Sequence, residues 1–217
     1  NLGVDYSFFN GRLYGKFDYY RRKVENLLFS VKVPQPPYTQ GSQMQNIGSM
    51  ESKGWEFEVG GNIIRTKDFT WSSNLNLSHN TGKILTLEGD NSYHNGNGFV
   101  APGTPGDAAR MEAGSTIGSF YIWKFAGFDD DGGFLLYNKD GEVIPAAQKT
   151  ENDKQYIGNY TPKLVIGWSH TLTYKNFDLG INLRSWIDFD VYNTINMYYG
   201  IQGQGNLNVL KDAYGKF

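Results

Sequence analysis

Glu56 and Glu58 are the residues of this sequence whose types and spacing come closest to acid–base chemistry. In an extended strand they share one face about 7 Å apart, a separation compatible with the paired carboxylates of glycosidases. A solvated or lumen-facing strand carries the same residues without any reaction, and it is the simpler interpretation. No G-x-S-x-G nucleophile motif occurs in the chain. We therefore predict no catalytic residues and no enzyme.

Metal-binding chemistry has one candidate, a run of three aspartates at 129–131 followed by two glycines. Carboxylate oxygens suit calcium, but the run lacks the spacing and the closing glutamate of an EF-hand loop. A solvated acidic turn is the simpler interpretation, and calcium at 129–131 stays open. The histidines, His79, His94 and His170, are too far apart to form a ligand motif, and cysteine is absent. We expect no metal site and no cofactor.

Aromatic residues in the polar, glycine-rich stretches are the best candidates for ligand binding. Aromatic faces suit the apolar faces of sugars, and the neighbouring Asn and Gln residues supply hydrogen bonds. Packing within the same loops, or contact with a protein partner, is the alternative that the sequence leaves open. The candidate substrate-binding residues are Tyr93, Trp123, Tyr198 and Tyr199.

Six segments alternate apolar and polar residues, which is the pattern of strands with one apolar face. In the first segment Leu2, Val4 and Tyr6 share one side, and Asp5 and Ser7 lie on the other. This pattern predicts an all-β, antiparallel fold. The predicted strands are residues 2–9, 12–23, 53–64, 69–80, 163–174 and 177–188.

The connections between these strands alternate between short and long. The short ones are tight turns, of which Asn10-Gly11 is the strongest hairpin signal. The other short turns are at 65–68 and 175–176. The long connections, which we read as loops, are 24–50, 81–161 with a small hairpin within 120–144, and 189–217.

Strand length and loop asymmetry favour a membrane β-barrel over a soluble sandwich. Each predicted strand has about 10–12 residues, enough to cross a bilayer at a tilt, whereas soluble strands average about five or six. Short turns at one rim, long loops at the other and a girdle of aromatic residues are typical of outer-membrane barrels. A soluble β-sandwich that binds carbohydrate and a structural barrel of adhesion or secretion machinery are the alternatives. The girdle candidates are Phe8, Phe69, Trp71, Tyr174 and Phe177.

Composition narrows the function classes. The net charge of -2 over 217 residues gives no electrostatic support for nucleic-acid binding. Aromatic residues make up 16% and there are 27 glycines, which favours strands and turns. No run of about 18 apolar residues occurs, so no membrane-spanning helix is predicted. The strand pattern starts at Leu2, which predicts an internal piece or a processed fragment of a larger protein.

Five motifs in order resemble the C-terminal part of SusC/RagA-type TonB-dependent outer-membrane transporters. Individually they are short, but together they span nearly the whole chain. Ser52 stands where the family usually has Asn. The motifs are N-G-R-L-Y-G with D-Y-Y at 10–15 and 18–20, N-I-G-S-M-E-S-K-G-W-E at 46–56, I-G-S-F-Y-I-W-K-F-A-G at 117–127, Y-K-N-F-D-L at 174–179 and N-V-L-K-D at 208–212.

This resemblance implies a fold and a function. The family's barrel has about 22 strands, so residues 1–217 would supply about six of them, with 81–161 as a long extracellular loop. The plug domain and the TonB box have no counterpart in this sequence. The implied activity is import of a large nutrient, an oligosaccharide or a peptide, across the outer membrane of a Gram-negative, Bacteroidetes-type cell. The implied partners are TonB, a SusD-like surface lipoprotein that caps the barrel, and outer-membrane lipid.

Overall fold

The computed structural model describes residues 1–87, 93–95, 108–200 and 208–213, with residues 32, 93–95, 197 and 198 described by their backbone alone. The chain forms two compact units. The first comprises Asn1–Ser92, Ala113–Ile117 and Thr161–Phe189, and the second comprises Tyr93–Glu112, Gly118–Tyr160 and Asp190–Phe217. Within the described residues, no helix has the length and apolar character needed to span a membrane.

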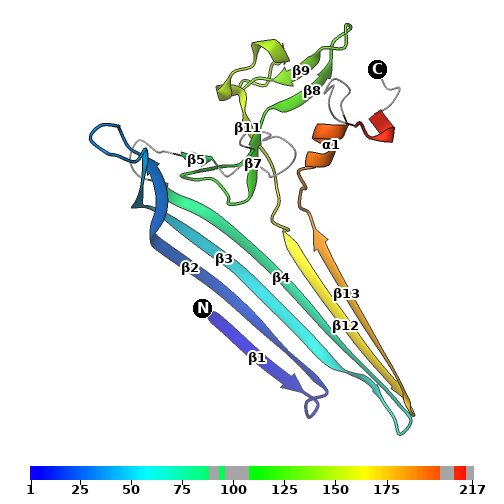
Figure 1. The fold of residues 1–217 in the computed structure, drawn as a ribbon. Coiled ribbons are helices and arrows are strands. Elements are labelled where there is room, and N and C mark those ends of the chain that lie inside the picture. Colours follow the sequence, from blue (N-terminus) through cyan, green and yellow to red (C-terminus); the bar gives the residue numbers. More distant parts are fainter. Residues whose placement is uncertain (88–92, 96–107, 201–207, 214–217) are drawn as a thin grey trace. The chain divides into compact units, whose positions relative to one another are not determined.

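The first unit is built on one six-stranded sheet in the order β1-β2-β3-β4-β12-β13, and every neighbouring pair is antiparallel (Figure 1). The predicted antiparallel strands are therefore all present and in the expected order. Their bounds are β1 Leu2–Phe8, β2 Leu13–Lys32, β3 Ser42–Arg65, β4 Phe69–Leu87, β12 Leu164–Tyr174 and β13 Phe177–Ile187.

The three short turns lie at the same end of this sheet (Figure 1). Asn10 and Gly11 have φ values of 57° and 80°, the positive values that a tight hairpin turn requires and that Asn and Gly tolerate best. The predicted girdle residues lie beside these turns, where Tyr174 pairs with both Phe69 and Phe177. We call this end of the strands the short-turn end.

The predicted long loop over 24–50 is wrong. β2 continues to Lys32 and β3 begins at Ser42, so the two strands form a hairpin well beyond the predicted ends. The alternation stops at Asn26, which has a φ of 58° and lies in a register shift between β2 and β3. A bulge swaps the faces of the residues that follow it, so a strict search for alternation ends there. β4 likewise extends to Leu87 rather than 80.

The register separates the side chains of the sheet into two faces. The apolar face carries Leu2, Val4, Leu13, Phe17, Tyr19, Trp55, Phe57, Val59, Leu75, Leu77, Ile166, Trp168, Leu179 and Leu183. The polar face carries Asp5, Lys16, Asp18, Glu56, Glu58, Asn74, Asn76, Ser78, Ser169, Thr171, Asp178, Asn182 and Arg184.

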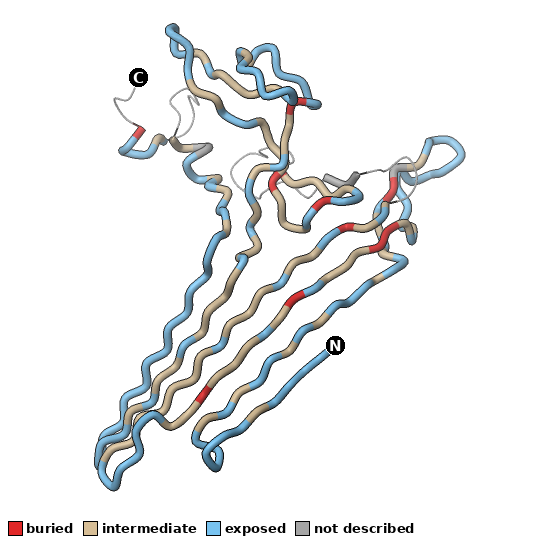
Figure 2. Tube along the Cα trace, turned by 180° about the vertical axis from the view of Figure 1, so that it is seen from behind, coloured by how far each residue is buried: buried red, intermediate tan, exposed pale blue. Residues whose placement is uncertain are grey.

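The apolar face is not covered by a second layer of the same unit. Leu2 is 68% exposed, Trp168 44% and Leu183 53%, and Figure 2 shows few buried positions along the sheet. A soluble sandwich instead buries its apolar faces between two sheets about 10 Å apart. The single sheet therefore argues against the sandwich alternative.

The second unit is made of short strands. β5 (Tyr93–Asn95) pairs with β6 (Arg110–Glu112), and β7 (Ser119–Ile122) pairs with β11 (Gln155–Asn159). The hairpin predicted within 120–144 is confirmed as a three-stranded meander. Its strands are β8 Lys124–Phe128, β9 Phe134–Tyr137 and β10 Val143–Pro145.

Short helices complete the second unit: η1 (Ala146–Gln148), η2 (Glu151–Asp153) and η3 (Lys211–Ala213) are 3-10 turns. The stretch 189–217, predicted as a loop, also contains the helix α1, Thr194–Tyr199. The Asn193 side chain begins α1 by accepting a hydrogen bond from the N–H of Asn196.

Candidate functional site

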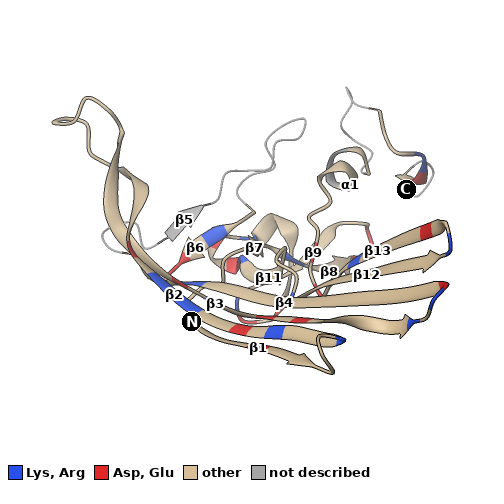
Figure 3. Ribbon diagram, turned by 90° about the horizontal axis from the view of Figure 1, so that it is seen from below, with Lys and Arg blue, Asp and Glu red and all other residues tan. Residues whose placement is uncertain are grey.

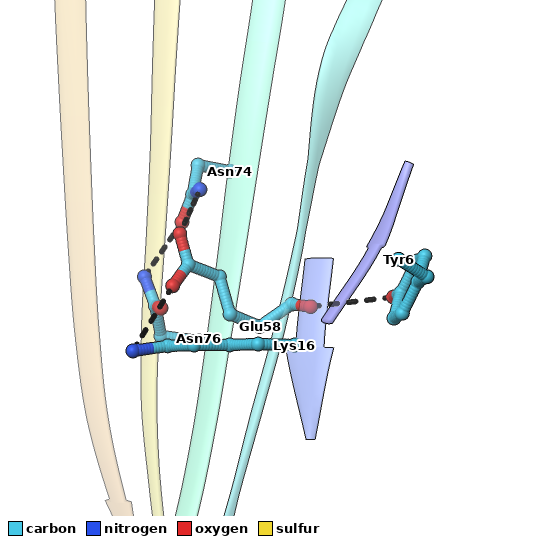
Figure 4. Close-up of polar contacts among 5 residues, drawn as sticks. All are labelled: Tyr6, Lys16, Glu58, Asn74 and Asn76. Atoms are coloured by element: carbon cyan, nitrogen blue, oxygen red, sulfur yellow. Dashed lines mark hydrogen bonds and ion pairs between the residues drawn. The ribbon is translucent and has the colours of Figure 1, made fainter. Parts of the chain in front are cut away.

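The polar face holds a hydrogen-bonded cluster around Glu58. The Asn74 amide donates to Glu58 Oε1 at 2.7 Å, and Lys16 Nζ lies 3.8 Å from Glu58 Oε2. The Asn76 amide donates in turn to Asn74 Oδ1 at 2.7 Å (Figure 4). The cluster forms because the register places Lys16, Glu58 and Asn76 in one row across β2, β3 and β4.

Glu56 and Glu58, the carboxylate pair of the catalytic hypothesis, lie on the polar face as predicted. Glu56 lies in the next row, opposite Asp18 of β2 and Ser78 of β4. The pair therefore belongs to a band of acidic, basic and amide side chains that spans several strands. Such a band is what the water-filled lumen of a membrane barrel requires.

Polar atoms on the apolar face are paired with one another. The Trp168 indole N–H donates to the Ser73 hydroxyl at 2.9 Å, and the Trp71 indole N–H lies 3.3 Å from His170 Nδ1. A lipid-facing surface needs this pairing, because hydrocarbon offers no hydrogen-bond partner.

Glycines of the sheet lie beneath tyrosines of the neighbouring strand. A Cβ added to Gly54 would lie 2.6 Å from the Tyr20 hydroxyl, and one added to Gly60 would lie 2.7 Å from the Tyr14 ring. Both glycines are buried within the polar face. This arrangement covers the glycine backbone with an aromatic ring and leaves no room for a side chain.

Two of the four candidate substrate-binding residues have described side chains. The Trp123 indole N–H donates to the Thr150 carbonyl at 2.8 Å, and the Nζ atoms of Lys154 and Lys149 lie 4.4 Å and 5.3 Å from the centre of its ring. Tyr199 ends α1, and its carbonyl accepts from the N–H of Leu210 at 2.6 Å.

Tyr93 lies in β5 and Tyr198 in α1, but the side chains of both lie outside the described residues. Thus all four candidates belong to the second unit. No described contact brings Trp123 and Tyr199 together, and their role in binding remains a prediction.

The second unit also holds an aromatic cluster that the sequence reasoning missed. The Arg110 guanidinium lies 4.0 Å from the centre of the Tyr121 ring, and the Tyr121 and Tyr156 rings lie 5.0 Å apart. Tyr156 and Tyr121 face each other across the β7–β11 pair. The aromatic content of 119–122 and 155–159 is the sequence signal that could have identified it.

The aspartate run at 129–131 forms a turn. Asp129 Oδ1 accepts from the N–H of Asp131 at 3.1 Å and from the N–H of Gly133 at 2.5 Å. Asp129 thus caps the backbone of the β8–β9 connection, a common role of Asp in turns. Among the described residues, no group of three or more acidic or histidine side chains is arranged to hold a metal ion.

Comparison with known proteins identifies the family. A family model described as TonB dependent receptor-like, beta-barrel, matches residues 1–193. TonB-dependent receptor P3 of Formosa agariphila is 33% identical over 213 residues, which cover 89% of this chain and 20% of the relative. TonB-dependent receptor SusC of Bacteroides thetaiotaomicron is 32% identical over 200 residues, covering 88% and 19%.

A solved structure agrees with these relatives. The structure of the RagAB peptide transporter matches with a TM-score of 0.69 and 26% identity, covering 84% of this chain and 20% of that chain. The chain therefore spans about a fifth of the length of its relatives. Family model, relatives and sheet confirm both the resemblance and the antiparallel transmembrane β-barrel fold. The chain belongs to the TonB-dependent receptor family, as part of the β-barrel of a SusC/RagA-type member.

Proposed function

We propose that this chain forms wall and outer loops of a transporter that imports a large nutrient across the outer membrane of a Bacteroidetes-type cell, with energy supplied through TonB. One observation carries the proposal: a single sheet has one uncovered apolar face and one hydrogen-bonded polar face. That combination suits a wall between lipid and an aqueous lumen. Transport makes and breaks no covalent bond, so the chain needs no catalytic residue.

The partners follow from the family. A SusD-like lipoprotein would cap the barrel, and the connection 81–161 would reach it from the extracellular side. The length of the β4–β12 connection supports this assignment, because it is long enough to hold most of the second unit. TonB would act through parts of the protein outside this chain.

The substrate class is an oligosaccharide or a peptide. The similarity to RagAB, which is a peptide transporter, favours a peptide. The aromatic residues of the second unit favour a sugar equally well, because their ring faces suit the apolar faces of pyranose rings. Contact with substrate is proposed for Tyr93, Trp123, Tyr198 and Tyr199.

Deletion of the full-length gene in its own bacterium tests the transport proposal. The deletion strain should lose uptake of one labelled oligosaccharide or peptide library, and wild-type uptake of the same library should stop when a protonophore removes the energy source. The full-length protein should fractionate with the outer membrane and require detergent for extraction. Unchanged uptake of both libraries, or a protein that is soluble without detergent, would reject the proposal.

Substitutions in the second unit test the contact residues. Trp123→Phe keeps an aromatic face but removes the N–H that donates to Thr150, whereas Trp123→Ala removes both. If the ring contacts substrate, uptake should survive in the first variant and fall in the second, with equal amounts of folded protein. Equal uptake in both variants assigns the ring to loop packing alone. Tyr199→Phe and Tyr199→Ala make the same comparison in α1.

A further inference from the structure

A groove opens on the apolar face at its short-turn end. It has a volume of about 610 Å³, which is within the range of about 300–1,000 Å³ typical of small-molecule sites. Its lining is almost entirely apolar and comes from β2, β3, β4 and β12, with Phe9 and Arg12 of the first turn at its mouth. The main lining side chains are Leu13, Val59, Ile63, Leu75 and Trp168.

Glycine backbone forms the floor of the groove. Gly60 and Gly61 line it, and a Cβ on Gly61 would lie 2.6 Å from the Arg12 carbonyl, so the two strands are too close there for a larger residue. The aromatic residues of the lining are Trp168 and Phe9, and Phe9 is 77% exposed. Each of the four contributing strands already has both of its neighbours in the sheet, so the groove is complete on this face.

One positive charge, that of Arg12, lies at the mouth of the groove. The Arg12 guanidinium is held in place because Nε donates to the Asn62 carbonyl at 3.0 Å and Nη2 to the Ile63 carbonyl at 3.1 Å. Arg65, Lys67 and Lys175 lie in or beside the other two short turns, together with the acidic residues Asp68 and Asp178 (Figure 3). Basic residues at the end of a membrane-spanning segment attract anionic lipid headgroups.

We propose that this groove is a binding site for one phospholipid of the leaflet beside the short turns. An acyl chain lies along the floor at Gly60 and Gly61 between Trp168 and Phe9, and the phosphate accepts hydrogen bonds from Arg12. The assignment rests on the proposed membrane location of the apolar face. It goes beyond a general lipid contact, because an indented floor and a fixed guanidinium select one lipid molecule at one place.

Native mass spectrometry of the full-length transporter, extracted in mild detergent and exchanged into phosphatidylglycerol nanodiscs, tests the site. Leu75→Trp fills the groove, whereas Leu77→Trp makes the same change on the same face of the same strand outside the lining. Wild type and Leu77→Trp should keep one tightly bound phospholipid, and Leu75→Trp should lose it. Folding is checked by heat-dependent mobility on gels.

A second pair of variants keeps the test decisive if Leu75→Trp does not fold. Arg12→Gln removes the charge at the mouth and should weaken phospholipid retention about tenfold, the effect of losing one charge-assisted hydrogen bond. Arg65→Gln removes a turn charge outside the lining and should leave retention unchanged. Equal retention in Arg12→Gln and wild type overturns the proposal.

Other occupants give distinct results. Retention of lipopolysaccharide instead of phospholipid, or of a protein in place of any lipid, overturns the assignment. A protein that is soluble without detergent would reject the proposed function itself. Normal nutrient uptake in cells, together with equal phospholipid retention by the extracted Leu75→Trp and wild-type proteins, would reject the groove alone.

Discussion

The Trp168 indole N–H donates to the Ser73 hydroxyl at 2.9 Å, across the pair of strands β12 and β4 and on the apolar face of the sheet. Trp71 and His170 form a second contact of this kind nearby. In water either donor could bond to solvent, but hydrocarbon offers no such substitute. These contacts let an apolar surface carry indole rings in lipid without an unsatisfied donor.

Substituting Ser73→Ala should destabilise the barrel, because it leaves the Trp168 N–H without its acceptor. The expected cost is about 1–2 kcal/mol in the free energy of unfolding, the size of one lost hydrogen bond in a membrane protein. Urea unfolding of the full-length protein in lipid vesicles measures it. Ser72→Ala, on the opposite face of β4, is the control and should change stability less. Equal effects would contradict the role of the Trp168–Ser73 contact.

Arginine substitutions at adjacent positions of β4 should have opposite consequences. Leu77→Arg places a charge on the apolar face and should cost about 2–4 kcal/mol near the bilayer midplane. Ser78→Arg places the same charge on the polar face, opposite Glu56, and should be tolerated. The amount of folded protein in the outer membrane distinguishes the two. Equal tolerance would show that the apolar face does not contact lipid.

Glycine positions should differ in their tolerance of a methyl group. A Cβ on Gly54 would overlap the His79 carbonyl and the Tyr20 hydroxyl, whereas one on Gly180 of β13 would meet nothing within 4 Å. Gly54→Ala should therefore destabilise the sheet by about 1–3 kcal/mol, the usual cost of overpacking. Gly180→Ala is the matched control. Urea midpoints compare them, and equal midpoints would refute the steric argument.

Acid should loosen the second unit through Asp153. The Thr150 hydroxyl donates to its carboxylate at 2.7 Å, the Thr150 N–H at 2.8 Å and the Lys139 N–H at 3.2 Å, and these hydrogen bonds lower the pKa of Asp153. A carboxyl group with a lowered folded pKa stabilises the folded state above its unfolded pKa of about 3.9, and this contribution is lost as the pH falls through the folded value.

Local stability around Asp153 should thus be constant from neutral pH to about pH 5 and decline below it. Hydrogen exchange of residues 139–153, corrected for the intrinsic effect of pH on exchange, measures this decline. Asp153→Asn should open more easily at neutral pH and lose the pH dependence. A pH profile identical to that of wild type would show that another group is responsible.

The sheet could be predicted from the sequence where local signals are strong. Asn10-Gly11 defines a turn, and strict alternation on both sides of it identifies the strands and their faces. The strand ends could not be predicted, because the bulge at Asn26 breaks alternation without ending the pairing of β2 with β3. Alternation of apolar and polar residues shows which side chains face the same side, whereas strand pairing depends on hydrogen bonds of the backbone.

Contacts between distant segments could not be predicted from the sequence. Nothing near Glu58 in the chain indicates that Asn74 will donate to it, since that contact depends on the register of β3 against β4. The lysines beside the Trp123 ring, Lys149 and Lys154, likewise come from the segment that follows the meander. The prediction of Trp123 as a ligand residue considered its type alone and not these neighbours.

β4 and β12 are hydrogen-bonded neighbours, although β4 ends at Leu87 and β12 begins only at Leu164. Ser78 can pair with Val165 only if the long segment between them loops out of the sheet. Strand pairing over such a separation is slow compared with closing a hairpin. The β4–β12 pair should therefore be the last of the six-stranded sheet to form, and protein trapped before this step should expose the unpaired edge of β4 to chaperones.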